Sequence, residues 1–420
     1  MLERVSLFNQ KRDYVLFLSA SLLIFFLSIF LEYKSYKEFT VFDSTLVKAT
    51  VLKQYLKSKN NRTYQVLKLK TQSGLTFYTT AKRSLQDLHG KNIELEIWPK
   101  ELDFHKYLST FYARSKILTI ENGDTIRDDI NSYISSAHEN QYAANIYKAL
   151  YTATPLDKEL QKSFSNLGIS HLLAISGFHL GVLSAILLFL IRPVYTFAQD
   201  RLFPYRNSKL DIFLFVSLIL FVYLVFLDSP PSLLRSFAML VIGFILYDRG
   251  IKIISMQTLF LTLVLLLSFF PRLLFMNGFW LSAAGVFFIF LFLDNFKHLN
   301  KSLQFMLLPV WVYLTMLPLS LALFHNFSIY HPLSILWSIL FTLFYPLSIF
   351  LHVIGQGDIF DPLLIDLIGL GATGSINIVG IYLFTVYVLI SFASVFYRYA
   401  LYMLILLCLF LFIDSVYYIT

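Results

Sequence analysis

Ten long apolar runs constrain the fold of this chain more than any other feature of its sequence. The runs lie at residues 14–31, 171–191, 210–227, 232–247, 253–270, 278–293, 305–324, 332–354, 378–396 and 399–419. A helix of about 20 apolar residues is long enough to cross the hydrocarbon core of a membrane. The chain is 57% apolar and only 14% charged, unlike soluble domains. We therefore expect a polytopic α-helical membrane protein with about 9–10 membrane segments, of which the run containing Pro346 is broken or re-entrant.

The distribution of positive charge predicts the orientation of these segments. The basic stretches are residues 1–13, 192–209, 248–252 and 294–302. Cytoplasmic loops of membrane proteins carry the excess of Lys and Arg. We expect a multi-pass protein of the cytoplasmic (inner) membrane, with a cytoplasmic N-terminus and with residues 32–170 outside the cytoplasm. Glu32 follows the first run in place of a small-residue cleavage site, so we expect an uncleaved anchor.

Residues 40–105 have a different pattern from the rest of the chain. Apolar and polar residues alternate over several short runs, which is typical of half-buried strands. Four or five such strands predict a small extracytoplasmic β-barrel; an oligonucleotide-binding (OB) barrel is one candidate, and any other small β-domain is the alternative. The predicted organisation is a first membrane helix over 1–39, the OB-like barrel over 40–105, an amphipathic helical connector over 106–165 and a membrane channel domain over 166–420.

The predicted β-domain is basic. Residues 43–105 contain 11 Lys and Arg against 6 Asp and Glu. A basic groove with aromatic platforms binds single-stranded nucleic acid without sequence preference. An ordinary solvated face and attraction to anionic lipid headgroups are the alternatives. The residues that we assign to DNA binding are Lys48, Tyr64, Lys68, Lys70 and Tyr78.

The stretch GISHLLAISGFHLGVL places polar side chains inside the second apolar run. On one continuous helix, His171, Ser176 and His179 fall on one face, and Gly177 and Gly181 on another. Polar groups at membrane depth normally face a cavity, a pathway or a partner, so we predict that the first face lines a channel. The G-x-x-x-G pair predicts helix packing. Packing histidines are the alternative for the first face, and a Ser–His nucleophile and base is another, although no G-x-S-x-G elbow accompanies them.

The stretch DSPPSLLRSFAM contains the second group of polar residues. Ser232 and Arg235 are three residues apart and share a helix face. A helix N-terminus favours anions, and Arg235 adds a permanent positive charge. We therefore interpret both residues as phosphate contacts on a translocation path. The alternative is that Arg235 snorkels to the interface or pairs with Asp228.

Two further stretches add candidate residues. NGFWLSAAG contains Ser282, which we assign to the channel lining, and Gly285, which we assign to helix packing. Asn326 lies where one apolar run ends, before a restart at Pro332. We expect a helix break there beside a cavity, and Asn326 in the channel lining.

Several motors and active sites have no signature in the sequence. The chain contains neither G-x-x-x-x-G-K-[ST] nor H-E-x-x-H, which are the signatures of P-loop nucleotide binding and of one class of zinc hydrolase. Cys408 is the single cysteine, so the printed chain forms no internal disulfide and has no cysteine metal cluster. We therefore expect no cofactor, no metal and no enzymatic activity.

Four stretches resemble, in order, the ComEC-type competence protein family. They are SHLLAISGFHLG, PPSLLRSFAM, NGFWLS and LPLSLALFHNFS. The resemblance implies a channel that passes single-stranded DNA into the cytoplasm during natural transformation, with His171, Ser176, His179 and Arg235 on or beside the path. It also implies a periplasmic DNA-binding protein and a cytosolic helicase-like translocase as partners, besides membrane lipids; a homo-oligomer is left open. The alternatives are a small-solute or lipid transporter and an intramembrane Ser/His hydrolase.

The sequence departs from the family's pattern in two respects. Many members end in a metallo-β-lactamase-like domain, whereas the printed chain ends at Thr420 without the ligand motifs of one. We expect a short form, in which degradation of the other strand needs a separate protein. Members often carry a disulfide in the barrel, which one cysteine cannot form.

Overall fold

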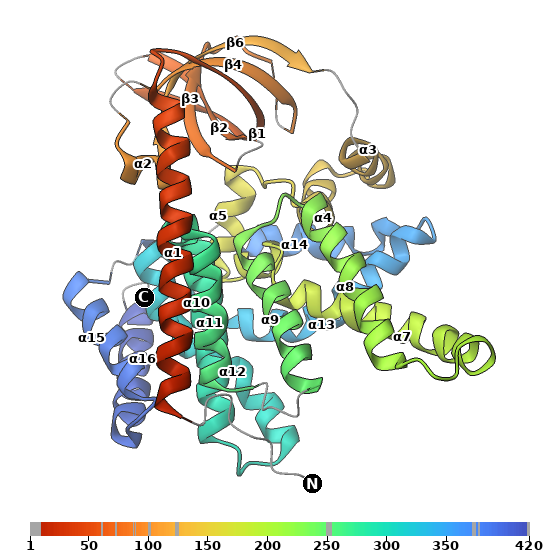
Figure 1. The fold of residues 1–420 in the computed structure, drawn as a ribbon. Coiled ribbons are helices and arrows are strands. Elements are labelled where there is room, and N and C mark those ends of the chain that lie inside the picture. Colours follow the sequence, from red (N-terminus) through yellow and green to blue (C-terminus); the bar gives the residue numbers. More distant parts are fainter. Residues whose placement is uncertain are drawn as a thin grey trace. The chain divides into compact units, whose positions relative to one another are not determined.

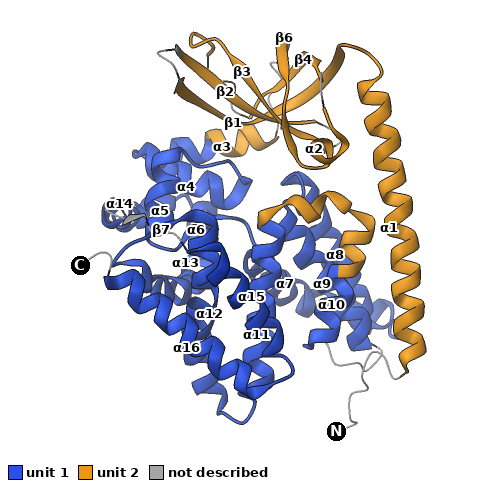
Figure 2. Ribbon diagram, turned by 90° about the vertical axis from the view of Figure 1, so that its left-hand side faces the viewer, with its two compact units in different colours: residues 1–7, 133–263, 278–420 blue, residues 8–132, 264–277 orange. Residues whose placement is uncertain are grey.

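The structure is a computed structural model, and it divides the chain into two compact units. It describes residues 10–59, 62–71, 74–86, 88, 90–99, 102–121, 126–248, 254–371, 375–376 and 379–417. Unit 1 comprises residues 1–7, 133–263 and 278–420, and unit 2 comprises residues 8–132 and 264–277. Figure 2 colours the two units separately. Most of the N-terminal basic stretch and of the basic loop at 248–252 lies outside the described residues.

Unit 2 combines one long helix with a six-stranded sheet. Its helices are α1 (Lys11–Thr40), α2 (Phe104–Leu108), the first part of α3 (Ile126–Ala137) and the 3-10 helix η1 (Pro271–Phe275). Its strands are β1 (Thr45–Lys59), β2 (Arg62–Thr71), β3 (Thr76–Ala81), β4 (Asn92–Trp98), β5 (Thr110–Tyr112) and β6 (Arg114–Glu121). The 30 residues of α1 give a length of about 45 Å, more than a membrane core requires.

The sheet has the strand order β5-β3-β2-β1-β4-β6. All neighbouring strands pair antiparallel except β3 and β5, which are parallel. The two end strands of this order are consecutive in the chain, because Ala113 alone separates β5 from β6. The prediction of a helical connector from residue 106 is therefore wrong over 110–121. Phe111, Ala113 and Ile117 keep an even spacing and pack in the core of the sheet, and a bulge then places Ile120 in the core as well, three residues after Ile117.

The core of unit 2 lies between the sheet and one end of α1. Phe77 and Phe111 stack with ring centroids 5.6 Å apart at its centre. Tyr36 and Phe39, in the last turns of α1, pack against this core, and the Tyr36 hydroxyl donates to the Leu102 carbonyl over 2.6 Å. The C-terminal end of α1 is thereby fixed to the β-domain (Figure 1).

Unit 1 is almost entirely helical. Its first helices are α4 (Gln141–Thr152), α5 (Lys158–Asn166), α6 (Ser170–Leu173), α7 (Gly177–Leu202), α8 (Ser208–Phe226) and α9 (Pro231–Asp248). After α10 (Met256–Phe269), inside which the boundary between the units falls, come α11 (Asn277–Asn295), α12 (Lys301–Phe324), α13 (Ser334–Val353), α14 (Asp361–Leu370), α15 (Ile381–Ala393) and α16 (Arg398–Tyr417). Short elements between them are β7 (Asn326–Phe327), η2 (His331–Leu333), η3 (Gly357–Phe360) and β8 (Ser375–Ile376).

Eight helices of the described residues are long and apolar enough to cross a membrane. They correspond to eight of the ten predicted runs, which supports a polytopic helical membrane protein. The other two runs form α10 and α15, which have 14 and 13 residues and are shorter than a full span. The predicted break between α12 and α13 is confirmed, but the interruption expected at Pro346 is wrong, because α13 continues through this residue.

Candidate functional site

The stretch with the two histidines does not form one helix, contrary to the prediction. His171 lies in the single turn α6, the chain is extended at Ala174, and α7 begins only at Gly177. Ser176 is the N-cap of α7, and its backbone N–H donates to Nδ1 of His179 over 3.2 Å. The Ser176 cap therefore starts a new helix inside the stretch for which the periodicity suggested one continuous helix. His171 and His179 belong to different elements and share no helix face.

The two histidines have different surroundings. His179 is 1% exposed, and its ring packs edge-on against Tyr345 of α13 with centroids 4.6 Å apart. Its Nδ1 accepts a hydrogen bond, and its Nε2 is buried without a partner of normal geometry among the described residues. His171 is exposed; its Nδ1 lies 3.0 Å from the Gly168 carbonyl and its Nε2 3.4 Å from Ser338 Oγ of α13.

Arg235 is buried among hydroxyl groups. Its guanidinium donates to Ser282 Oγ of α11 from Nε over 3.0 Å and from Nη2 over 2.8 Å. Further contacts go to Ser236 Oγ at 3.1 Å and to the Met239 sulfur at 2.8 Å. These partners are all neutral, and the residue is only 4% exposed. The predicted site residues Arg235 and Ser282 are thus brought together.

The first turns of α7 and α9 meet beside this arginine. Ser232 Oγ donates over 2.9 Å to the carbonyl of Ile175, in the extended segment before α7. A Cβ added to Gly177 would collide with the Ser236 hydroxyl and lie 3.6 Å from Arg235 Nη2. The absence of a side chain at Gly177 therefore allows α7 to approach α9. We call Gly177, Ser232, Arg235, Ser236 and Ser282 the Arg235 cluster.

The other candidate residues of the membrane helices lie apart from these contacts. A Cβ on Gly181 or on Gly285 would meet nothing within 4 Å, counted over the described residues. Neither glycine marks a close contact within this part of the chain, and their packing role stays a prediction. Asn326, at the break after α12, donates from Nδ2 to Ser165 Oγ over 3.3 Å.

Two lysines and two tyrosines of the β-domain form a row across four strands. Lys53 of β1 pairs with Lys68 of β2, Lys68 pairs with Tyr78 of β3, and Tyr78 pairs with Tyr112 of β5. The Lys68 ammonium lies 5.8 Å from the centroid of the Tyr78 ring. Partial burial lowers the pKa of Lys68 and raises the pKa of Tyr78. A cation over an aromatic ring on a half-buried surface suits a phosphate and a base of one strand.

The remaining β-domain candidates flank this row. Lys70 and Tyr64 lie two and four residues from Lys68 in β2, on the same side of the strand, and both are half-buried. Lys48, in β1, is exposed and pairs in register with Glu94 of β4. We call Lys48, Lys53, Tyr64, Lys68, Lys70, Tyr78 and Tyr112 the Lys68 face.

Sequence reasoning missed several of these residues. A bulge between Val51 and Lys53 shifts the register, so Lys53 joins the face of Lys68; alternation alone does not reveal this. Ser236 is four residues after Ser232 and donates to its carbonyl over 2.9 Å, and this spacing was a usable signal. His138 also comes together with His352 and Asp361, which are more than 200 residues away in the sequence, and no local pattern predicts this contact.

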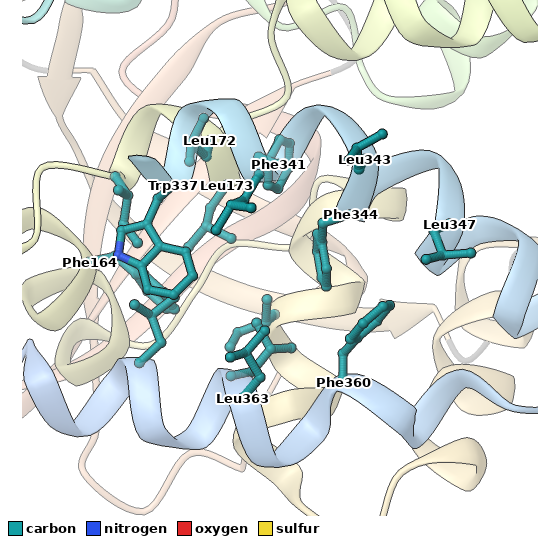
Figure 3. A pocket seen from close by; sticks show the side chains of 15 residues that line it. Phe164, Leu172, Leu173, Trp337, Phe341, Leu343, Phe344, Leu347, Phe360 and Leu363 are labelled. Carbon is teal, nitrogen blue, oxygen red and sulfur yellow. The ribbon is translucent and has the colours of Figure 1, made fainter. Parts of the chain in front are cut away.

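An apolar cavity of about 270 Å³ lies between α13 and α14 (Figure 3). Phe344 and Leu347 of α13 line it from one side, and Phe360 and Leu363 from the other. Trp337 and Phe164 also line it. A lining without charged or hydroxyl side chains cannot compensate a phosphate for lost water. This cavity is therefore not a phosphate site.

These features define a class of protein: a polytopic helical membrane protein that carries a small β-sheet domain and buries an arginine among hydroxyls. The profile of the competence protein family matches residues 152–415, which is more than half of the chain. The chain therefore belongs to the competence protein family. The match covers the Arg235 cluster, and the Lys68 face lies outside it.

Two similar proteins are ComE operon protein 3 of Bacillus subtilis (strain 168) and an uncharacterized protein of Aquifex aeolicus (strain VF5). The first is 35% identical over 178 residues, which are 41% of this chain and 21% of that protein. The second is 29% identical over 181 residues, which are 43% of this chain and 39% of that protein. The chain thus spans well under half of either relative. No solved structure matches the chain.

Proposed function

We propose that this protein is a membrane channel that passes single-stranded DNA across the cytoplasmic membrane during natural transformation. Membership of the competence protein family supports a role in DNA uptake. The observation that carries the proposal is the Arg235 cluster, in which a buried guanidinium contacts hydroxyls and a thioether. A cation with this set of neutral partners suits a passing phosphate.

A single buried cation suits the passage of DNA better than tight binding of DNA. A polyanion crossing a low-dielectric slab needs cations that bind each phosphate weakly enough to release it. Burying one arginine at membrane depth already costs about 3 kcal/mol on insertion scales. Serine hydroxyls from α9 and α11 lower that cost without fixing the guanidinium in an ion pair. In this proposal His171, Ser176 and His179 lie beside the same route, at the start of α7.

We propose further that the sheet of unit 2 is an extracytoplasmic OB-like barrel that receives the DNA. The strand order supports a closed barrel, because the consecutive strands β5 and β6 pair with β3 and β4 respectively. The Lys68 face combines ammonium groups with tyrosine rings, as single-strand binding requires. A periplasmic DNA-binding protein would deliver the DNA to this face, and a cytosolic helicase-like translocase would pull it through.

The hydrolase alternative has one feature in its favour. Ser176 Oγ lies 3.2 Å from His179 Nδ1, the spacing of a nucleophile and its base. The same Nδ1 also accepts from the Ser176 backbone, and no carboxylate orients the ring through Nε2 among the described residues. Helix capping accounts for both contacts, so we favour the channel. The apolar cavity keeps a lipid transporter as the second candidate.

The experiment that tests the proposal follows DNA in a strain that lacks this protein. Labelled duplex DNA is supplied, and the label is measured separately outside the cytoplasmic membrane and in the cytoplasm. We expect DNA to accumulate outside and not to enter the cytoplasm, with entry restored by the complete gene. Normal entry in the deletion strain would exclude the channel. Loss of binding at the cell surface would place the function before the membrane step.

A further inference from the structure

Two histidines and an aspartate form a buried chain in unit 1, apart from the Arg235 cluster. His138, between α3 and α4, has its Nδ1 at 3.0 and 2.9 Å from the two carboxylate oxygens of Asp361 in α14. Its Nε2 lies 3.0 Å from Nε2 of His352 in α13. The exposed fractions of His138, His352 and Asp361 are 7%, 6% and 8%. Groups this buried must satisfy their hydrogen bonds within the protein.

The hydrogen-bond partners of the two rings determine how many protons the three side chains hold together. His352 Nδ1 lies 2.7 Å from the Ser348 carbonyl, which only accepts, so this nitrogen carries a hydrogen. An ionised Asp361 also only accepts, so His138 Nδ1 carries one too. If both rings were neutral, two Nε2 lone pairs would face each other at 3.0 Å. One additional proton turns this contact into an N–H···N hydrogen bond.

We propose that His138, His352 and Asp361 form a buried site for one proton, and that its occupancy holds α13 against α14 and the segment before α4. The proton is held on an imidazole ring, as an imidazolium beside the Asp361 carboxylate. This arrangement leaves the three side chains with no net charge. Loss of the proton would leave a buried negative charge and two opposed lone pairs, each of which is costly.

The described groups around His138, His352 and Asp361 carry no positive charge that could replace the proton. Tyr133 donates to the His352 carbonyl over 2.7 Å, and Tyr151 donates to Ser348 Oγ over 2.8 Å. Tyr147 stacks on His138 with centroids 4.6 Å apart. Burial raises the pKa of Tyr147, and the charges of Tyr151, Asp361 and the exposed Asp358 raise it further. The described titratable groups that face His138 and His352 are therefore tyrosines and two carboxylates.

The same helix connects this proton site to the start of α7. On α13, Ser338 contacts His171, Tyr345 packs on His179, and His352 lies two turns further along. A change in the position of α13 therefore reaches both histidines of the candidate channel. The proton site itself does not depend on the proposed function, because its geometry involves no DNA.

The test is nitrogen NMR of the full-length protein, labelled with ¹⁵N-histidine and held in lipid nanodiscs. At about pH 8 an ordinary histidine has lost its proton, so we expect one persistent imidazolium signal. This signal should vanish in His138→Gln and in Asp361→Asn, and it should remain in the control His298→Gln, which changes an exposed histidine. A wild-type spectrum without an imidazolium at this pH would overturn the proposal, whatever the variants do.

A second measurement tests the mechanical part of the proposal. Stability supplied by the bound proton is present at low pH and is lost as the pH rises past its release. We expect the midpoint of thermal unfolding of the wild type to fall by about 2–4 °C across that step. His138→Gln holds no proton and should show no such step. An equal pH dependence in both proteins would contradict a role in holding α13.

Discussion

Replacing Gly177 by alanine tests the close approach of α7 and α9. The new Cβ would collide with the Ser236 hydroxyl and lie 3.1 Å from Ser236 Cβ. Turning the hydroxyl away breaks its bonds to the Ser232 carbonyl and to Arg235 Nη2, which contribute about 1 kcal/mol each. Relative to the same substitution at Gly181, we expect the free energy of unfolding to fall by about 2 kcal/mol, or roughly 30-fold in the ratio of folded to unfolded protein.

Gly181→Ala is the matched control, because it adds the same methyl group one turn later, where nothing lies within 4 Å. Alanine is the better helix former by about 1 kcal/mol, so this variant should be as stable as the wild type or more stable. Both are measured by detergent-induced unfolding of the purified protein. In the Ser236→Gly background, Gly177→Ala should cost little, because its collision partner is gone. Equal stability of Gly177→Ala and Gly181→Ala would refute the packing argument.

Three further predictions concern charged residues. Arg235→Glu should abolish transformation with normal amounts of protein in the membrane. Arg235→Lys should lower transformation at least about tenfold, because a lysine lacks the planar guanidinium that binds a phosphate through two hydrogen bonds. Transformation at the wild-type level by either variant would contradict the phosphate contact. Lys68→Gln should weaken single-stranded DNA binding by the full-length protein, measured by fluorescence anisotropy. The slope of the logarithm of the binding constant against the logarithm of the salt concentration should become shallower by about 0.7. An unchanged slope would argue against DNA binding at the Lys68 face. Glu32→Gln removes a partly buried ion pair with Arg272, 2.6 Å long, and should cost about 1–2 kcal/mol in thermal unfolding, whereas Lys106→Gln, in an exposed pair, should change stability by under about 0.5 kcal/mol.

The membrane helices were largely predictable because length and apolar content decide them. Eight of the ten predicted runs became helices of spanning length. The two shorter helices, α10 and α15, show that an apolar run also includes residues of the adjoining turns. The uninterrupted α13 shows that neighbouring packing can accommodate Pro346 inside a helix.

The geometry of the candidate site was less predictable, because it depends on local capping and on contacts between distant elements. Periodicity suggested one helix through His171 and His179, but the Ser176 cap starts α7 only at Gly177. The contact between Arg235 and Ser282 joins residues 47 positions apart. The order of the strands was also hidden, since the last strands lie beyond residue 105, where an amphipathic helix was predicted.

The most direct measurement of the central claim maps where DNA touches the protein during uptake. Transforming cells receive DNA that contains a photoreactive thymidine, are irradiated during uptake, and the cross-linked peptides of this protein are identified by mass spectrometry. The account predicts cross-links in the stretches that hold the Arg235 cluster, at 175–179, 230–239 and 277–285. Cross-links confined to other helices, in cells that take up DNA normally, would contradict it.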